Sequence, residues 1–378
     1  MRECPMISDQ IYLSRPLIGN EELDAVREVF ESKYLTEGPK TREFEARFAE
    51  YIDVKHGIAT TSCTSGLEVC LRAVGVNVGD EVIVPDFTFP ATALAVYALG
   101  ATPVLLDVSP KDYVMNATEL ASRITGKTKC ILCVSNLGFP LDYAPLMELA
   151  TKRGISVIED AACSTGTLVN GKKLGSMVDA AVFSFHARKI LTTGEGGMIV
   201  TSDDELAEKC REIKNFGVTK SEGGRQTFGA WGTNLKMSNI AAAIGLVQLK
   251  RLESIIEERT KRARKYRELL HGKSTVELVE LPEHVRYNYY CYPLRVDGSV
   301  REKLLFSLRE RKIEAQICSY ALHRQPFFQS LRGTAMSSDV LFPNSTQAFE
   351  CLMQLPIHHE LTTQQQEYIC NTLLDLLR

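Results

Sequence analysis

Several features that would restrict the function of this chain are missing from its 378 residues. No stretch reaches the roughly 18 apolar residues of a membrane span, and the first residues, MRECPMISDQ, hold no apolar core of signal-peptide length. The formal net charge of -3 and the pI near 6.2 give no field that would gather nucleic acid or anionic lipid. We therefore expect a cytoplasmic protein that binds neither nucleic acid nor membranes.

Disulfide bonds are not expected either, although the chain has 11 cysteines. An odd number scattered from Cys4 to Cys370 is typical of a reducing compartment, where thiols fill the core. One Cys-x-x-Cys pair, Cys130 and Cys133, lies in a predicted strand, where residues three apart point to opposite faces. That spacing argues against a redox or metal pair, and we expect no metal site.

What the sequence does have is a regular alternation of strand-like and helical segments. The strand-like runs are 56–60, 81–85, 102–107, 130–134, 155–159, 180–185 and 197–201. Helical stretches lie between most of them, at 66–73, 90–99, 144–152 and 203–214. This order predicts an α/β protein with a large, doubly wound, mostly parallel sheet. Asn170-Gly171 is predicted to form a tight hairpin turn added to the same layer.

The second part of the chain predicts a smaller unit. Residues 238–270 are continuously helical, and the pattern beyond them indicates a strand at 288–296, a helix at 300–311, a strand at 313–318 and a helix from 362. We expect a large domain at 1–237, a linking helix at 238–270 and a small α+β domain at 271–378. The N-terminal segment is expected to pack on the small domain.

Lys189 is the most informative residue of the chain. It follows the predicted strand 180–185 and precedes the turn Gly194-Glu195-Gly196-Gly197. Ligands of open α/β sheets bind at the carboxyl ends of the strands, and an amine in a partly dry pocket loses proton affinity and becomes nucleophilic. The alternative is an ordinary surface lysine, and the residues that accompany Lys189 decide between the two.

Hydroxyl groups are predicted to gather at the same edge of the sheet. The run 61–66 (TSCTSG), with Cys63, Thr64 and Ser65, lies between strand 56–60 and helix 66–73, where side-chain hydroxyls and free backbone N–H groups suit a phosphate. Ser184 lies shortly before Lys189 and adds another hydroxyl. Simple N-capping of the helix is the alternative for the first group.

An acid and an aromatic ring complete the set. Asp160 ends the strand 155–159, where it could keep a heterocyclic nitrogen protonated or only cap the next helix. Phe89 follows strand 81–85 and could provide a flat face for an aromatic ring or be part of the core. Lysine, acid, phosphate-binding hydroxyls and aromatic face are together the parts of a pyridoxal 5′-phosphate site.

The order of the motifs resembles the sugar aminotransferases of the DegT/DnrJ/EryC1/StrS group, which are pyridoxal phosphate enzymes of fold type I. The likeness covers nearly the whole chain, in the segments 34–39 (YLTEGP), 64–65 (TS), 84–89 (VPDFTF), 158–162 (IEDAA), 184–186 (SFH), 189 (K), 194–197 (GEGG), 232–237 (GTNLKM), 320–323 (YALH) and 355–358 (LPIH).

The resemblance implies a role for each site residue. Lys189 would bind the cofactor as a Schiff base, Asp160 would pair with its ring nitrogen, and both would be catalytic. The expected cofactor contacts are Cys63, Thr64, Ser65, Phe89, Asp160, Cys163, Ser184, Lys189 and Asn234. Asn234 would reach the cofactor of a neighbouring subunit, which implies a homodimer with shared active sites. The expected substrate contacts are His186, Lys236, Tyr320 and His323.

Three sites depart from the family pattern, and one of them, Ser135-Asn136-Leu137-Gly138, lacks the tyrosine commonly found before that glycine. The other two are single residues. Cys163 stands where Gln or His usually lies near the phenolic oxygen of the cofactor, and a thiol is a poorer hydrogen-bond donor. Lys236 replaces the usual Arg of the Asn-x-Arg-Met motif, so a point charge takes the place of a planar fork. Recognition of the donor or of the sugar is therefore expected to differ.

The resemblance implies an aminotransferase that converts a keto-sugar, expected to be nucleotide-linked, with glutamate as amino donor. A pyridoxamine phosphate-dependent sugar dehydratase is an alternative on the same fold, but such members carry His in place of the lysine, and Lys189 argues against it. A non-catalytic sensor or regulator stays open because of Cys163 and Lys236.

Overall fold

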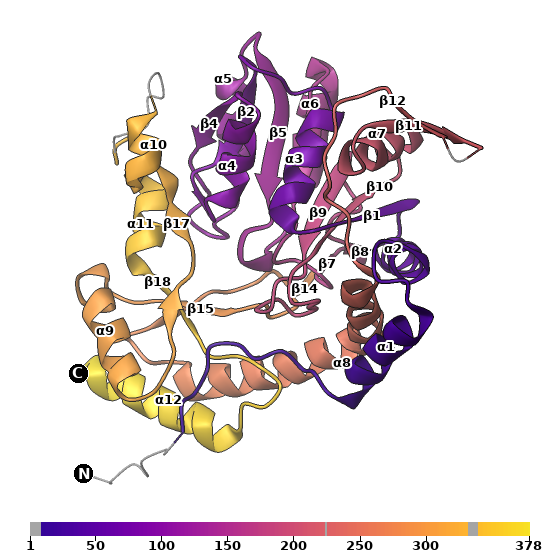
Figure 1. Cartoon of the computed structure of the whole chain (residues 1–378). Helices are drawn as coiled ribbons and strands as arrows, with labels where there is room; N and C mark the ends of the chain where they lie inside the picture. The colour runs from indigo at the N-terminus through magenta and orange to yellow at the C-terminus, as the bar shows by residue number, and fades with distance from the viewer. Residues whose placement is uncertain (1–8, 224, 332–338) are drawn as a thin grey trace.

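The computed structural model describes residues 9–223, 225–331 and 339–378 (Figure 1). Its centre is a seven-stranded sheet with the order β1-β10-β9-β6-β5-β2-β4. These strands are β1 (His56–Thr60), β2 (Glu81–Pro85), β4 (Thr102–Leu106), β5 (Thr128–Val134), β6 (Ser156–Asp160), β9 (Ala180–Ser184) and β10 (Gly197–Thr201). β10 runs opposite to the other six strands of this sheet, which all run in one direction, so the predicted mostly parallel sheet is confirmed.

Helices cover both faces of the sheet, because neighbouring strand residues are apolar on both sides. In β2, Val82 packs into the core beneath one layer of helices and Ile83 into the core beneath the other. The first layer holds α3 (Cys63–Ala73), α4 (Ala91–Ala98) and α7 (Asp204–Lys214). The second holds α2 (Pro39–Ile52), α5 (Ala117–Arg123) and α6 (Tyr143–Arg153). This double layer is the predicted doubly wound arrangement.

The cysteines behave as core residues. Cys130 and Cys133 are fully buried and belong to the cores on opposite faces of the sheet, as their spacing predicted. All cysteines in the described ranges are free. Cys4, and most of the N-terminal stretch for which no signal peptide was predicted, lie outside those ranges. Each helix within the ranges is too short or too polar to span a bilayer.

The long helix α8 (Asn239–Leu270) joins two cores. Its first half packs against α1 (Asn20–Ser32) and α2, and its last turns pack against α12 (Thr363–Leu376), which lies alongside it in Figure 1. A four-stranded sheet completes the second core, with β13 (Glu277–Leu278), β15 (Tyr292–Arg295), β16 (Gln316–Ile317) and β18 (Leu352–Leu355), covered by α9 (Gly298–Glu310). The smaller α+β unit is therefore present. We propose that the large domain ends at residue 237, that residues 238–270 form the linking helix and that the small domain begins at residue 271.

The N-terminal segment crosses to the C-terminal core. Ile11 forms a parallel bridge with Ile313, and the backbone N–H of Leu13 donates to Oε2 of Glu314 at 3.0 Å. The N–H of Ile357 donates to the carbonyl of Leu13, also at 3.0 Å. These bonds bring a strand-like segment from the start of the chain between elements from its end.

The hairpin at Asn170-Gly171 is confirmed, but its place in the main sheet was wrong. β7 (Leu168–Val169) and β8 (Lys172–Lys173) flank two residues with positive φ, 50° for Asn170 and 77° for Gly171. The hairpin pairs with β14 (Val285–Arg286) in a separate three-stranded sheet. Turn chemistry fixes a hairpin locally but carries no information about its partner strand.

Further short elements complete the fold. They are the hairpin of β11 (Val218–Glu222) and β12 (Arg225–Phe228), the pair of β3 (Phe87–Thr88) and β17 (Tyr320–Ala321), and the helices α10 (Pro326–Ser330) and α11 (Pro343–Cys351). The β11–β12 hairpin projects from the body of the molecule (Figure 1). The β3–β17 pair ties the C-terminal part of the chain to the carboxyl end of β2.

Candidate active site

A cavity of about 550 Å³ opens at the carboxyl ends of the parallel strands. Nine of the residues singled out in the sequence line it: Cys63, Thr64, Phe89, Asp160, Cys163, Ser184, His186, Lys189 and Tyr320. Four do not: Ser65, Asn234, Lys236 and His323. The N-terminal segment and the C-terminal sheet close the cavity opposite the main sheet, with Leu13, Ser14, Gln316 and Gln354 among the lining residues.

The N-terminus of α3 forms one end of the cavity. Ser62 caps the helix, since its Oγ accepts from the N–H of Ser65 at 3.1 Å while its own N–H donates to Oγ of Ser65 at 3.0 Å. Helix capping was the alternative to phosphate binding for Cys63-Thr64-Ser65, and in the structure the hydroxyl of Ser65 is engaged in this capping. The amides of Cys63 and Thr64 precede the first intrahelical bond, so they stay available at a helix N-terminus that favours anions.

A close backbone approach holds this helix end beside β10. A Cβ atom on Gly197 would lie 2.5 Å from the carbonyl group of Ser62. Gly197 pairs with Ser184 across β10 and β9, and Ser184 is 7% exposed and lines the cavity. The glycine therefore lets two groups that were predicted to bind a phosphate, the α3 amides and the Ser184 hydroxyl, lie at one place.

Asp160 ends β6 inside the cavity and is 6% exposed. Its Oδ2 accepts from Oγ1 of Thr92 at 2.8 Å and its Oδ1 from the N–H of Ala162 at 3.2 Å. Burial raises the pKa of the Asp160 carboxyl, and these two hydrogen bonds oppose the rise. The carboxylate is thus held in one orientation with little water around it.

The amine of Lys189 lies against a thiol and a phenol. Nζ is 3.3 Å from Sγ of Cys163 and 3.5 Å from the hydroxyl of Tyr290. Burial alone would lower the pKa of Lys189, but Cys163 and Tyr290 outweigh it and the net pKa is raised. The expectation that the pocket lowers the proton affinity of this amine was wrong, because these two neighbours stabilise the charged form.

Tyr290 was missed in the sequence, although it contacts the amine of Lys189. It lies in the run Asn288-Tyr289-Tyr290, immediately before β15, and lines the cavity. The only available signal was a cluster of tyrosines in the predicted strand 288–296, which in the structure begins at Tyr292. Strand periodicity cannot tell which ring faces a cavity built by another part of the chain.

An aromatic pair lies across the cavity from the lysine. The ring of Phe89 is 64% exposed, and its centroid is 6.2 Å from that of Tyr320. Because both side chains line the cavity and Phe89 has a free face, a flat heterocycle can stack there.

Charged and polar groups surround the mouth. His186 accepts a hydrogen bond at Nδ1 from the N–H of Arg188 at 3.2 Å, and its Nε2 lies 3.8 Å from Glu195. The Arg188 guanidinium donates to Oε1 of Gln316 at 3.3 Å, and the backbone carbonyl of Arg188 accepts from the Ser14 hydroxyl. The turn that carries Lys189 is therefore fastened to both the N-terminal and C-terminal parts of the chain.

Asn234 and Lys236 lie outside the cavity of their own chain. Asn234 is exposed and forms a bridge with Asn215. Burial lowers the pKa of Lys236, whose ammonium lies 4.4 Å from the centroid of the Phe216 ring. Neither side chain is in a position to contact a ligand bound beside Lys189 of the same chain.

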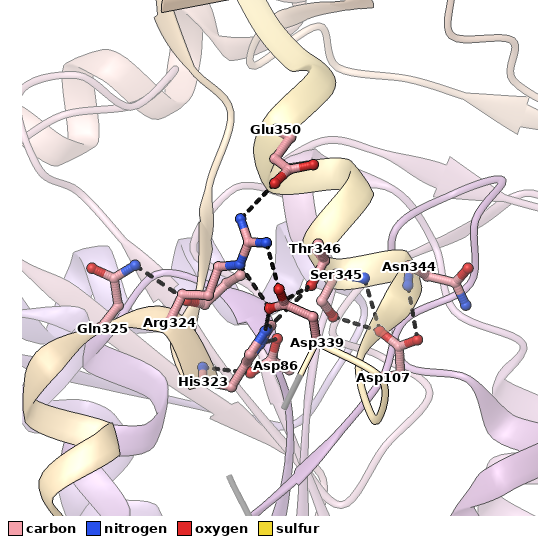
Figure 2. A network of polar contacts seen from close by, with 11 residues as sticks. Asp86, Asp107, His323, Arg324, Gln325, Asp339, Asn344, Ser345, Thr346 and Glu350 are labelled. Atoms are coloured by element: carbon pink, nitrogen blue, oxygen red, sulfur yellow. Dashed lines mark hydrogen bonds and ion pairs between the residues drawn. The ribbon is translucent and has the colours of Figure 1, made fainter. Parts of the chain in front are cut away.

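His323 is also held away from the cavity, in the network of Figure 2. Its ring is 1% exposed, with Nδ1 2.6 Å from Asp86 and Nε2 3.0 Å from Asp339. The β3–β17 pairing turns Tyr320 into the cavity and brings His323 against Asp86, which is fully buried. The expected substrate contact of His323 therefore does not fit, and the residue links the C-terminal part to the end of β2.

Replacing His323 by glutamine is expected to lower the free energy of unfolding by about 1–3 kcal/mol at pH 6, because the buried Asp86 loses its charged partner. Burial lowers the pKa of His323, but Asp86 and Asp339 outweigh it and the pKa is raised. The stabilisation is thus complete below the unfolded-state pKa and is lost as pH rises through the folded-state pKa. Urea unfolding at pH 6 and pH 9 should show a smaller difference between variant and parent at pH 9.

The exposed His271 provides the control, since His271→Gln should change stability little at either pH. A difference for His323→Gln that does not depend on pH would mean that the ring contributes only by its stacking on Phe342.

Comparison with known proteins now identifies the family. The model of the DegT/DnrJ/EryC1/StrS aminotransferase family matches residues 16–374. The chain belongs to this family. The family is one of pyridoxal phosphate-dependent sugar aminotransferases, and the chain is an enzyme of that class. The described residues hold no group of three or more side chains that could bind a metal ion.

Individual relatives extend over almost the whole chain. Spore coat polysaccharide biosynthesis protein SpsC of Bacillus subtilis is 32% identical, over 97% of this chain and 96% of its own. The aminotransferase TlmJ of Streptoalloteichus hindustanus is 33% identical with a TM-score of 0.90, covering 97% and 98%. The pyridoxal phosphate form of the putative sugar aminotransferase Spr1654 of Streptococcus pneumoniae is 28% identical with a TM-score of 0.91, covering 97% and 98%. The fold is thus fold type I of the pyridoxal phosphate enzymes.

Proposed function

We propose that this enzyme transfers an amino group from glutamate to a nucleotide-linked keto-sugar, with pyridoxal 5′-phosphate as cofactor. One observation carries the proposal: the amine of Lys189, the carboxylate of Asp160 and the N-terminus of α3 meet in one cavity. The name of SpsC, a polysaccharide biosynthesis protein, and that of Spr1654, a putative sugar aminotransferase, favour a sugar substrate.

The residues of the cavity fit the cofactor. The Cys63 and Thr64 amides and the Ser184 hydroxyl suit its phosphate, and Phe89 has a free face for its ring. The buried Asp160 carboxylate suits a protonated ring nitrogen. When bound, pyridoxal phosphate supplies an electron sink for the carbon that loses its proton.

The chain itself would perform binding and proton transfer. Lys189 would hold the cofactor covalently and, once released, its amine would move the proton of the donor as general base and acid. Asp160 keeps a positive charge on the ring nitrogen, and the hydrogen bond from Thr92 fixes its carboxylate for that task. Cys163, 3.3 Å from the amine of Lys189, would lie near the phenolic oxygen of the cofactor, where the resembling family usually has Gln or His.

The mouth of the cavity favours an anionic substrate. Arg188 is exposed on the cavity wall and forms no ion pair with a carboxylate of the described residues. A guanidinium in this position can bind the carboxylate of an amino acid donor or the diphosphate of a sugar nucleotide. Gln316 and Ser14 lie beside it as neutral hydrogen-bonding partners.

Absorbance and product analysis test the function. The cofactor bound to Lys189 should absorb at about 420 nm, and this absorbance band should disappear on addition of glutamate. A screen of keto-sugar nucleotides with mass detection should then yield an amino-sugar product. A product that has lost water without gaining nitrogen would favour the dehydratase. A bound cofactor that responds to no donor would favour a sensor, the alternative that Cys163 and Lys236 left open.

We further propose that the active site is completed across a homodimer in the cytoplasm. Asn234 and Lys236 lie outside the cavity of their own chain, and in the resembling family this loop reaches the cofactor phosphate of the neighbour. The projecting β11–β12 hairpin leads into this loop. Phe228 at the end of the hairpin and Trp231 just after it are 62% and 57% exposed and offer apolar surface for a second copy.

Mixing Lys189→Ala chains with Asn234→Ala chains should restore about a quarter of parental activity, because half of randomly paired dimers are mixed and each then has one intact site. The measurement is turnover after subunit exchange, with each variant alone as control. If mixing restores nothing although exchange is demonstrated and Asn234→Ala alone is defective, Asn234 does not act in the site of its neighbour.

A further inference from the structure

Tyr290 brings a hydroxyl from the C-terminal part of the chain to the amine of Lys189. The oxygen lies 3.5 Å from Nζ, and the same Nζ lies 4.6 Å from the centroid of the Tyr290 ring. The amine can therefore form a hydrogen bond with the hydroxyl and lie close enough to the ring for a cation–π contact. No other tyrosine among the cavity-lining residues makes a contact with Lys189.

Buried side chains hold Tyr290 in this position. Oδ1 of Asn288 accepts from the N–H of Tyr290 at 2.9 Å, and Nη1 of Arg259 donates to the Tyr290 carbonyl at 3.3 Å. Asn288 is fully buried and Arg259 is 2% exposed. Both peptide groups of Tyr290 are thus fixed, which is how proteins place a functional side chain accurately.

The same asparagine connects the tyrosine to the other neighbour of Lys189. Nδ2 of Asn288 donates to the carbonyl of Cys163 at 2.9 Å and to that of Thr165 at 3.0 Å. One buried amide therefore sets the backbone of both residues that contact the amine, although they lie far apart along the chain. Such a connection is more than packing of a tyrosine in a core requires.

We infer that Tyr290 is a further catalytic residue, which holds the amine of Lys189 by its hydroxyl and stabilises the protonated amine by its ring while Lys189 transfers protons. The inference rests on the proposed function. The proton stays with Lys189 and the substrate throughout: the amine takes it from the donor carbon and returns it to the cofactor carbon. The phenol keeps its own proton and changes only which partner it hydrogen-bonds.

The protonation state of the phenol agrees with this role. The charge of Lys189 lowers the pKa of Tyr290, but burial and the neighbouring thiols outweigh it and raise the pKa to about 12. Tyr290 is therefore neutral near pH 7, so it can donate to the free amine and accept from the ammonium.

The kinetic test separates hydroxyl from ring. Tyr290→Phe should slow the half-reaction with glutamate about 10–100-fold with little change in the donor KM, and Tyr290→Leu should slow it further because the ring contact is also lost. Tyr289→Phe is the matched control, since the neighbouring hydroxyl makes no contact with Lys189. The rate is measured by stopped-flow absorbance.

A second readout does not depend on turnover. Because the neutral phenol can accept a hydrogen bond from the ammonium of Lys189, Tyr290→Phe should shift the pH at which acetic anhydride labels Lys189 to a lower value, in chain free of cofactor. The labelling is read from the Lys189 peptide by mass spectrometry, and a role in packing alone would not change it.

The outcomes distinguish the inference from the proposed function. If the parent enzyme transfers amino groups and Tyr290→Phe matches it in both rate and labelling, the inference is overturned alone. If the parent shows no aminotransfer with any donor, the proposed function fails, and the catalytic role of Tyr290 fails with it.

Discussion

Lys189→Ala is expected to lower aminotransfer at least about a thousandfold, because covalent attachment and proton transfer are both lost. No other amine can replace it, since Lys189 is the only lysine among the residues that line the cavity. The α3 amides, Ser184 and Asp160 remain, so the variant should still bind pyridoxal phosphate without a covalent bond.

Borohydride reduction followed by peptide mapping checks the attachment, and steady-state turnover checks the rate. In the parent the reduced label should lie on Lys189, and in the variant it should be absent. Lys172→Ala is the control, because Lys172 is exposed on the β7–β8 hairpin away from the cavity. A label on another lysine of the parent would show that Lys189 is not the residue that binds the cofactor covalently.

Asp160→Asn is expected to lower turnover about 100-fold or more while the free energy of unfolding changes by less than about 2 kcal/mol. Asparagine keeps the shape and can still accept the hydrogen bond from Thr92, so the fold loses little. It removes the negative charge that would keep the ring nitrogen protonated. The rate should therefore fall far more than the stability.

Glu159→Gln provides a matched control on the same strand. Glu159 is fully buried, accepts from the Tyr143 hydroxyl at 2.9 Å and the Gly175 amide at 3.1 Å, and does not line the cavity. Burial raises the pKa of Glu159 to about 7, so its charge is already partly lost near neutral pH and the amide should be tolerated in turnover. Nearly parental turnover of Asp160→Asn would reduce Asp160 to a structural role.

The elements of the large sheet could be predicted because their signals are local. Strand-like runs of apolar residues and the helices between them follow from the period of hydrophobic residues. Such runs also placed Asp160, Ser184 and Lys189 at one edge, because parallel strands share their carboxyl end. The antiparallel course of β10 and the separate sheet of the Asn170-Gly171 hairpin depend on pairing, about which a single sequence is silent.

The same distinction holds for the site. The sequence by itself determined which residues could provide the lysine, the acid and the phosphate ligands, since each lies at or shortly after the carboxyl end of a predicted strand. Only the tertiary structure decided that Tyr290 meets Lys189, that Thr92 fixes Asp160 and that His323 turns to Asp86. These partners lie far apart along the chain, and the packing of remote elements, not local periodicity, determines which of their side chains meet.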